Sequence, residues 1–264
     1  MNILFIGDIV GKSGRRTVAK ILPDLRKELD ADLVIANVEN IAHGTGITKS
    51  TLEEMKSAGV DAFTSGNHVW AKPEVLDIFA EKNYQLIRPA NFPEGSPGTG
   101  SLTLRVGART LLLVNLQGRV FMTQDLTDPF RGLDGILAEY KAKKPDAVIV
   151  DLHAEATSEK VAFGFWADSR VAAVVGTHTH VGTADAKILP QGTAYVTDIG
   201  MVGPRDSVIG VDKDVIIKQF LTQQPSRHEI PDGGVQTFNA VLIKIDPAKH
   251  LATSIERIDR ETEI

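Results

Sequence analysis

Short apolar runs alternate with amphipathic stretches from the start of the chain, and this alternation restricts the fold more than any other feature. Apolar runs predict strands at 3–6, 33–38 and 62–64. Apolar residues at helical spacing predict helices at 13–29, 48–57 and 73–80. Thr48 is a favoured helix cap, and Pro73 suits a first helical turn. Strands and helices in alternation are typical of a parallel sheet flanked by helices, so the sequence indicates the α/β class.

The middle and the end of the chain add antiparallel patterns to this alternation. A short turn at 107–109 separates two apolar runs and predicts a hairpin added to the sheet. The remaining predicted strands lie at 147–152, 171–175, 187–189, 193–196, 235–245 and 252–257, and the remaining helices at 133–142, after Thr157 and at 215–221. We find no repeat, low-complexity segment or linker, so residues 1–264 are expected to form a single domain.

The composition excludes several classes of protein. The 264 residues include no cysteine, so thiolate chemistry is absent and any metal site must use His, Asp, Glu or Asn. No stretch approaches the roughly 20 apolar residues of a membrane span. The N-terminal segment lacks the basic start of a secretory signal, so we expect a cytoplasmic location. A formal net charge of −5 argues against a stable complex with nucleic acid.

Polar side chains follow five predicted strands at the point where each strand ends. They are Asp8, then Glu39 and Asn40, then Asn67 and His68, then His153, and finally His178 and His180. The carboxyl ends of parallel strands meet along one edge of a sheet, where ligands bind. Each residue alone has an ordinary explanation as a cap, a turn residue or a structural histidine. Burying two carboxylates among several imidazoles is unfavourable without a cation, so the whole set indicates a metal site.

The kinds of ligand indicate which metals the site would hold. Imidazole, carboxylate and amide groups without sulfur suit Mn, Fe, Zn or Ni. A set of this size is too large for one ion but fits two ions bridged by a carboxylate. Such a centre acidifies bound water and polarises a phosphoryl oxygen, which supplies a nucleophile without a Ser, Cys or Lys dyad.

The motifs of one enzyme superfamily occur along nearly all of the chain. They are GD at 7–8, GNH at 66–68, a lone His153 and GTHTH at 176–180. Together they resemble the calcineurin-like metallophosphoesterases. A closer resemblance, to the YmdB-type branch of bacterial phosphodiesterases, rests on ENIAHGTGI (39–47), RPANFP (88–93), NLQGR (115–119), DLHAEATSEK (151–160) and DIGMVGP (198–204). The resemblance implies a four-layer αββα sandwich of two mixed sheets flanked by helices. It also implies an enzyme that hydrolyses small phosphodiesters, namely 2′,3′-cyclic nucleotides, and that has a regulatory role.

The resemblance assigns roles to the polar residues at the strand ends. Asp8, Asn40 and His180 would hold one metal, Asn67, His153 and His178 the other, and Glu39 would bridge them. Fe or Mn would be the expected metals, and a metal-bridging hydroxide would attack phosphorus. His68, which would not be a ligand, would protonate the leaving alkoxide as general acid.

The sequence departs from the broad superfamily at three positions. Val10 replaces a usual histidine, Glu39 replaces the usual bridging aspartate, and Val69 stands where an acid is common. The first two departures are those expected of the YmdB-type branch, with Asn40 compensating for the absent histidine. The division of the ligands between the two ions stays open.

The sequence leaves two possible roles open for several further residues. His43 contacts substrate phosphate or closes a glycine-rich turn. Asn91 and Phe92 line the pocket, Phe92 by stacking on a base, or pack within a loop. Arg119 and Arg205 contact phosphate or a second copy of the chain, or form surface ion pairs, and we interpret His228 and His250 as surface residues.

The overall function also has alternatives. One is a phosphomonoesterase or nucleotidase that uses the same centre, and another is a metal-binding regulatory scaffold. The resemblance allows a homo-oligomer, but nothing in the sequence requires one.

Overall fold

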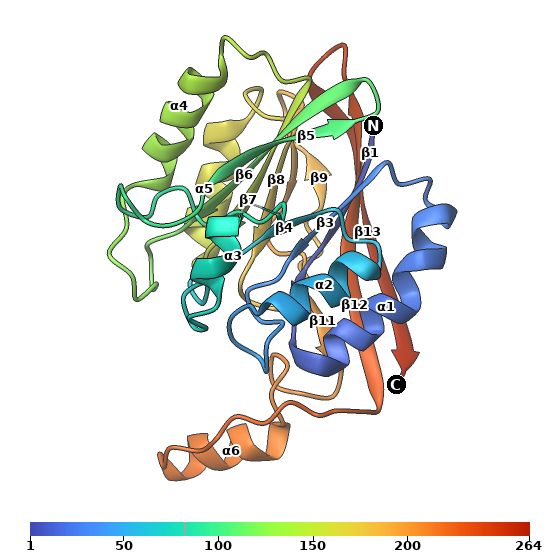
Figure 1. Cartoon of the computed structure of the whole chain (residues 1–264), viewed down its shortest axis with the longest axis vertical. Coiled ribbons are helices and arrows are strands. Elements are labelled where there is room, and N and C mark those ends of the chain that lie inside the picture. The colour runs from blue at the N-terminus through green and yellow to red at the C-terminus, as the bar shows by residue number, and fades with distance from the viewer. Residues whose placement is uncertain (82) are drawn as a thin grey trace.

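Two mixed β-sheets face each other in the computed structural model of the chain, which describes residues 1–81 and 83–264, and helices cover their outer faces (Figure 1). The helices are α1 (Gly11–Glu28), α2 (Lys49–Ser57), α3 (Val75–Glu81), α4 (Pro129–Tyr140), α5 (Thr157–Ala167) and α6 (Lys213–Thr222). The helices α1, α2 and α3 pack beside the first sheet, and α4 and α5 beside the second. The predicted four-layer αββα sandwich is therefore confirmed.

The first sheet joins the beginning of the chain to its end. Its order is β2 (Asp8–Ile9), β11 (Met201–Pro204), β12 (Val235–Asp246), β1 (Asn2–Ile6), β3 (Leu33–Asn37) and β4 (Ala62–Thr64), and β13 (Leu251–Glu263) also pairs with β12. The neighbours β1, β3 and β4 are parallel, and β12 is antiparallel to β1, with Ile3 opposite Ile243. The N-terminal strand therefore has a partner more than 200 residues away.

The second sheet contains the middle of the chain. Its order is β5 (Ser101–Val106), β6 (Arg109–Gln117), β7 (Ala147–His153), β8 (Ala173–Thr177), β10 (Ala194–Val196) and β9 (Lys187–Ile188). The four inner strands are parallel, and the edge strands β5 and β9 are antiparallel to their neighbours. The hairpin predicted around residues 107–109 is the β5–β6 pair.

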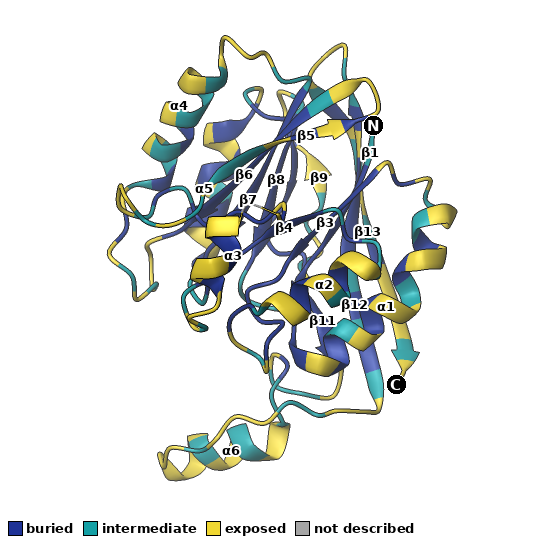
Figure 2. Cartoon of the chain, viewed as in Figure 1, coloured by how far each residue is buried: buried dark blue, intermediate teal, exposed yellow. Residues whose placement is uncertain are grey.

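Strands that are apolar on both faces produce this layering. In β1, Leu4 and Ile6 belong to the core beneath the helices, whereas Ile3 and Phe5 belong to the core between the sheets. Successive side chains of a strand point to opposite faces, so an unbroken apolar run indicates burial on both sides. A third core lies between the second sheet and the helices α4 and α5. Figure 2 shows the inner strands buried along most of their length.

Three features differ from the sequence-based expectations. The polar strand ends do not lie along one sheet but come from both. Asp8 does not cap α1, because it lies in the short strand β2 and the N-cap residue is Val10, which makes no side-chain cap. The strands β2 and β11 were not predicted, because each is short and their pairing with each other spans almost 200 residues. Within the part of the chain described, no helix is both long and apolar enough to cross a membrane.

Candidate metal centre

The polar residues at the strand ends converge where the carboxyl ends of both sheets meet. Asp8 lies in β2, Glu39 and Asn40 follow β3, and Asn67 and His68 follow β4 in the first sheet; His153 ends β7, and His178 and His180 follow β8 in the second. Asp8, Glu39, Asn40 and His153 are buried, which is unusual for groups of this polarity. The structure therefore brings these side chains together, and each sheet supplies part of the set.

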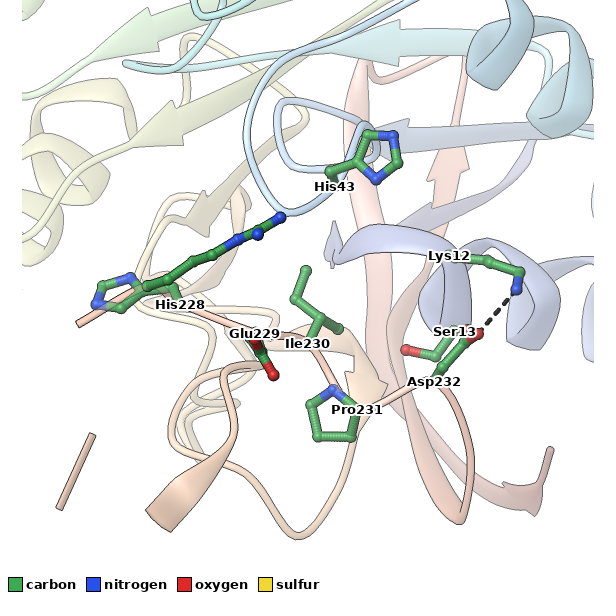
Figure 3. Close-up of a pocket in the computed structure, with 9 residues that line it drawn as sticks. Lys12, Ser13, His43, His228, Glu229, Ile230, Pro231 and Asp232 are labelled. Carbon is green, nitrogen blue, oxygen red and sulfur yellow. Dashed lines mark hydrogen bonds and ion pairs between the residues drawn. The ribbon is translucent and has the colours of Figure 1, made fainter. Parts of the chain in front are cut away.

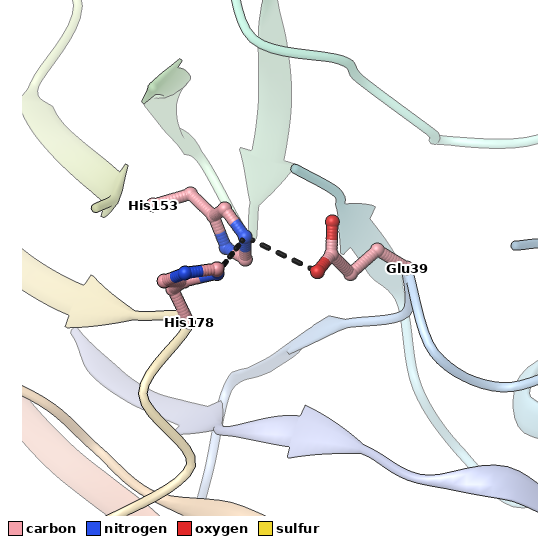
Figure 4. Close-up of side chains that lie close together, drawn as sticks. All are labelled: Glu39, His153 and His178. Atoms are coloured by element: carbon pink, nitrogen blue, oxygen red, sulfur yellow. Dashed lines mark hydrogen bonds and ion pairs between the residues drawn. The ribbon is translucent and has the colours of Figure 1, made fainter. Parts of the chain in front are cut away.

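One group of ligand atoms surrounds the imidazole of His153 (Figure 4). Its Nε2 atom lies 3.1 Å from Oε1 of Glu39, 3.0 Å from Nδ1 of His178 and 2.9 Å from Oδ1 of Asn67. Atoms of Glu39, His153 and His178 lie within 4.8 Å of one another, close enough to share an ion. These are nitrogen and oxygen donors without sulfur, which suit a first-row divalent cation.

A second group also contacts Oε1 of Glu39. The Nδ2 atom of Asn40 is 3.3 Å from Oε1 of Glu39 and 3.1 Å from Nε2 of His180. Asp8 accepts a hydrogen bond from the His178 backbone through Oδ2, at 3.1 Å. Its other oxygen, Oδ1, is buried, has no hydrogen-bond partner among the described residues and lies 3.8 Å from Nε2 of His180. A buried carboxylate oxygen without a donor is costly, so this arrangement fits a cation.

The buried groups change one another's pKa values. Burial acts to raise the pKa of Glu39, but the facing His153 outweighs it and lowers the pKa to about 2. Burial acts to lower the pKa of His153, but Glu39 raises it to about 9. Burial and the charge of His153 lower the pKa of His178 to about 3, and burial raises the pKa of Asp8. The side chains alone therefore form a Glu39–His153 ion pair beside a neutral His178, which can offer a lone pair.

Buried polar residues behind His153 fix its orientation. Thr177 Oγ1 lies 2.9 Å from Nδ1 of His153 and donates to Asp151 at 2.7 Å. Burial raises the pKa of Asp151 to about 6, although His153 and two threonine hydroxyls act against this. Sequence reasoning missed Asp151, but an aspartate inside the apolar strand AVIVDLH was a signal that could have identified it.

The loop that carries His178 and His180 has an unusual backbone. Both histidines have positive φ values, 102° and 64°, which non-glycine residues rarely adopt. A buried ion pair supports the loop: Lys160 Nζ donates to Asp198 Oδ2 at 2.7 Å and to the carbonyl of Thr177 at 2.8 Å. The Thr179 backbone also donates to Asp198, at 3.1 Å. Sequence reasoning missed this pair, although both residues lie in motifs that carry the family resemblance.

Glu155 is a further residue that sequence reasoning missed. Its Oε2 atom lies 3.0 Å from Nε2 of His178, on the opposite side of the ring from His153. A carboxylate in this position fixes the tautomer and the ring orientation of a metal-binding histidine. The signal was available in the sequence, because Glu155 follows His153 by two residues.

A cavity of about 870 Å³ opens beside the two groups. His68 lines it, donates its backbone N–H to Glu39 Oε2 at 3.0 Å, and has no side-chain hydrogen bond within the described residues. Several residues of the segment 205–234 also line this cavity. This segment carries α6, and we name it the arm (Figure 1). His43 lines this cavity and a smaller neighbouring one, which it shares with His228 (Figure 3). His228 is exposed, as expected, but it lies at the cavity wall.

Other candidate residues lie away from the cavity wall. Asn91 is buried and its amide donates to the carbonyls of Gln117 and Thr127, both at 2.8 Å. Phe92 packs against Trp70 with ring centroids 5.7 Å apart. These contacts fit the packed-loop interpretation. Arg119 and Arg205 form surface ion pairs, with Asp128 and with Asp206 and Glu261, and His250 is exposed.

A two-sheet sandwich with carboxylate, amide and imidazole groups gathered at its strand ends defines a metallophosphoesterase. Residues 4–258 match the model of a family described as YmdB-like protein, and the chain belongs to this family. The predicted resemblance is thus confirmed.

Individual relatives agree with this assignment. The chain is 47% identical over 258 residues to a Bacillus subtilis (strain 168) protein named 2′,3′-cyclic-nucleotide 2′-phosphodiesterase, covering 98% of this chain and 96% of the relative. A hypothetical protein from Thermus thermophilus has a crystal structure with a TM-score of 0.92 at 42% identity, covering 99% of each chain. The crystal structure of a novel phosphatase from Mycoplasma pneumoniae has a TM-score of 0.91 at 36% identity, covering 100% of this chain and 94% of that one.

Proposed function

We propose that the protein is a dinuclear-metal phosphodiesterase that hydrolyses 2′,3′-cyclic nucleotides with His68 as general acid. The observation that carries this proposal is the position of Glu39. Its Oε1 atom lies 3.1 Å from Nε2 of His153 and 3.3 Å from Nδ2 of Asn40, one residue from each group, beside a cavity that His68 also lines. A carboxylate shared by two sets of ligands is what a two-metal centre requires.

Two sets of residues would hold the metals. Asp8, Asn40 and His180 form one set, and Asn67, His153 and His178 form the other. Asn40 would serve as a ligand with its amide turned so that the oxygen faces the centre. Fe or Mn are the expected ions, and Zn or Ni are alternatives. When bound, such ions would acidify a water molecule and polarise the phosphoryl oxygens.

His68 is suited to proton transfer rather than to metal binding. Its backbone is held by Glu39, whereas its imidazole is on the cavity wall without a hydrogen bond to another described residue. A histidine in this position can give a proton to the departing sugar oxygen. Glu155 would support the centre by orienting His178.

The substrate class rests on the relatives and on the cavity. The Bacillus subtilis relative is named for cyclic nucleotides, and the cavity is large enough for a nucleotide. A phosphomonoesterase is the second candidate, because the Mycoplasma pneumoniae relative is described as a phosphatase.

The first experiment measures hydrolysis of 2′,3′-cyclic AMP and of AMP by the purified protein, with Mn²⁺ and with EDTA. We expect consumption of the cyclic ester only with Mn²⁺, and no consumption of AMP. Hydrolysis of AMP in place of the cyclic ester would support the phosphomonoesterase. Inactivity toward both, in protein shown to carry two metal ions, would contradict both candidates.

The second experiment tests the role of His68. We expect His68→Ala to lower kcat for 2′,3′-cyclic AMP by about 10²- to 10⁴-fold. Turnover of bis(p-nitrophenyl) phosphate should change far less, because p-nitrophenolate leaves without a proton. Metal content measured by mass spectrometry should match wild type, and His250→Ala, a change at an exposed histidine, is the control. Loss of metal in His68→Ala would show that His68 is a ligand instead.

A further inference from the structure

The arm, residues 205–234, contributes little to the cores of the molecule. It projects from the body, and no residue of α6 within it is buried (Figures 1 and 2). Phe220 is 73% exposed and Leu221 is 81% exposed. Large exposed apolar side chains that stabilise no core often mark a binding surface. The exposed apolar side chains of the arm are therefore not explained by a contribution to the stability of the fold.

The arm is attached to the candidate metal centre itself. His180 Nδ1 lies 2.8 Å from the backbone carbonyl of Ile209, in the arm, which leaves Nε2 facing Asp8 and Asn40. Ile209 has a φ of 49°, a rare value for a β-branched residue. Strain of this kind persists where the surrounding structure imposes it, commonly at functional sites. The two sides of the arm are tied by the bond from Asp212 N to Glu229 O, at 2.8 Å.

The cavity of about 870 Å³ is lined by both the candidate metal centre and the arm. His68 and Glu155 also line it beside the centre. From the arm, Ile216, Gln219 and Phe220 line it, and their spacing places them on one face of α6. Ile217 and Leu221 are also exposed but do not line this cavity. The same cavity therefore offers cation-binding groups and, on α6, an aromatic side chain, which suits a molecule with an anionic group and a flat apolar group.

Gln219 has an oriented amide on the cavity wall. Its Oε1 atom accepts from Ser226 Oγ at 2.9 Å and lies 3.2 Å from Nε2 of His228. Because the oxygen is occupied twice, the orientation of the amide is fixed. Its NH₂ group has no partner within the described residues and is free to donate to a ligand.

We propose that the arm binds the nucleobase of the substrate, with Phe220 stacking on the base and Gln219 donating a hydrogen bond to it. This inference rests on the proposed function, and it names the part of the chain that would distinguish a nucleotide from a simpler phosphodiester. A nucleotide has an anionic phosphate that suits the candidate metal centre and an aromatic ring that suits Phe220. Aromatic stacking and one donor are enough to hold a base without large buried area.

Binding tests the inference without relying on catalysis. We would measure by calorimetry the affinities of adenosine 3′-phosphate and of inorganic phosphate for three Mn²⁺-loaded proteins: wild type, Phe220→Ala and Leu221→Ala. We expect Phe220→Ala to weaken adenosine 3′-phosphate binding about tenfold and leave inorganic phosphate unchanged. Leu221→Ala, on the neighbouring exposed face, should bind both ligands as wild type does. Equal weakening in the two variants, or a wild type that binds the nucleotide no better than phosphate, would overturn the inference.

Kinetics separates this inference from the proposed function. Glycerol 1,2-cyclic phosphate has the same five-membered diester without a base, so Phe220→Ala should leave its kcat/KM unchanged. For 2′,3′-cyclic AMP the same variant should lose about tenfold in kcat/KM. Equal loss on both esters would overturn the inference while the phosphodiesterase stands. Hydrolysis of neither ester would overturn the proposed function, and the calorimetry would still decide the inference.

The apolar face of α6 has one competing occupant, a second copy of the chain. Light scattering on wild type and Phe220→Ala measures this directly. A lower molar mass for Phe220→Ala together with unchanged nucleotide affinity would make the arm an intersubunit contact and overturn base binding. An unchanged mass with weakened nucleotide binding supports it.

Discussion

Asp8 has a carboxylate that the protein alone does not satisfy. One oxygen accepts the His178 backbone N–H, whereas the other is buried without a donor among the described residues, and burial raises the pKa of the group. The negative charges of Glu39 and Asp198 act in the same direction on the pKa of Asp8. Unfavourable groupings of this kind are typical of sites where stability is lost in favour of function.

The first prediction replaces this carboxylate. Asp8→Asn keeps the acceptor for His178 and places an NH₂ group toward Nε2 of His180, so the metal-free variant should be more stable than wild type by about 1–2 kcal/mol. The same variant should lose the stabilisation that Mn²⁺ gives to wild type. Urea unfolding in EDTA and in Mn²⁺ measures both effects. Asp24→Asn, at a side chain that is 93% exposed, controls for the change in charge. An Asp8→Asn protein that is less stable than wild type in EDTA would contradict the prediction.

Among the residues of the centre, the sequence was sufficient for those that follow apolar strands. Parallel strands bring Asp8 and Glu39 to one end of the first sheet and His153 and His178 to one end of the second, and the apolar runs identified strands β1, β3, β7 and β8. The facing of the two sheets, which completes the cluster, could not be predicted from these runs. Lys160 and Asp198 were missed because their pairing depends on the packing of α5 against a loop 38 residues away. The proposed base contact of Phe220 could not be predicted from the sequence, because Phe220 has the same local pattern as any apolar helical residue.

At the scale of elements, one ion pair joins α5 to the loop after β10 and to the end of β8. Lys160 and Asp198 have side chains that are 1% exposed, and together they contact the backbone on both sides of His178. The positive φ values of His178 and His180 need such support, because isolated residues would relax to other conformations.

The second prediction breaks this pair. Lys160→Met leaves Asp198 buried without its countercharge and should lower the free energy of unfolding by about 3–5 kcal/mol. The double variant Lys160→Met/Asp198→Leu should recover part of this stability but not the affinity for Mn²⁺, because the loop still lacks its anchor. Chemical denaturation and metal titration measure the two quantities. Full recovery of Mn²⁺ affinity in the double variant would show that the pair does not position the histidines.

Tyr195 of β10 gives the third prediction, which concerns pH. Its ring packs against Gly164 of α5, where an added Cβ would lie 2.5 Å from the ring, and burial raises its pKa from 10.0 to about 12. The folded value is the higher one, so this contribution to stability is complete below pH 10 and is lost as pH rises toward 12. Between pH 8 and pH 11, wild type should lose about 1 kcal/mol more than Tyr195→Phe in urea unfolding. Equal losses would contradict the assignment.

At the scale of the whole molecule, the candidate centre draws on both sheets. Asp8, Glu39, Asn40 and Asn67 come from the first sheet, and His153, His178 and His180 come from the second. Ions held by all of them would link the two sheets at one end of the core that lies between them. Metal binding is then linked to the association of the sheets and not only to catalysis.

The fourth prediction removes the metal. At 100 times its dissociation constant, a ligand that binds only the folded state stabilises it by about 2.7 kcal/mol. For a chain of this size Mn²⁺ should therefore raise the Tm above its value in EDTA by roughly 5–10 °C. Differential scanning calorimetry checks this, with Glu39→Gln as the variant in which the increase should largely disappear. An equal increase in Glu39→Gln would place the stabilising metal elsewhere.

The pairing of β1 has a consequence for how the protein is made. One neighbour of β1 is β3, which follows soon after it in the sequence, but the other is β12 at Val235–Asp246. Likewise, β2 pairs with β11 at Met201–Pro204. A growing polypeptide acquires its N-terminal parts first. Until β11 and β12 have been synthesised, the first sheet lacks the two strands that lie between β2 and β1. The strand β2, which carries Asp8, then has no partner to pair with. Hydrolytic activity, as proposed, would therefore begin only after translation has passed the last of these strands, which keeps unfinished chains inert.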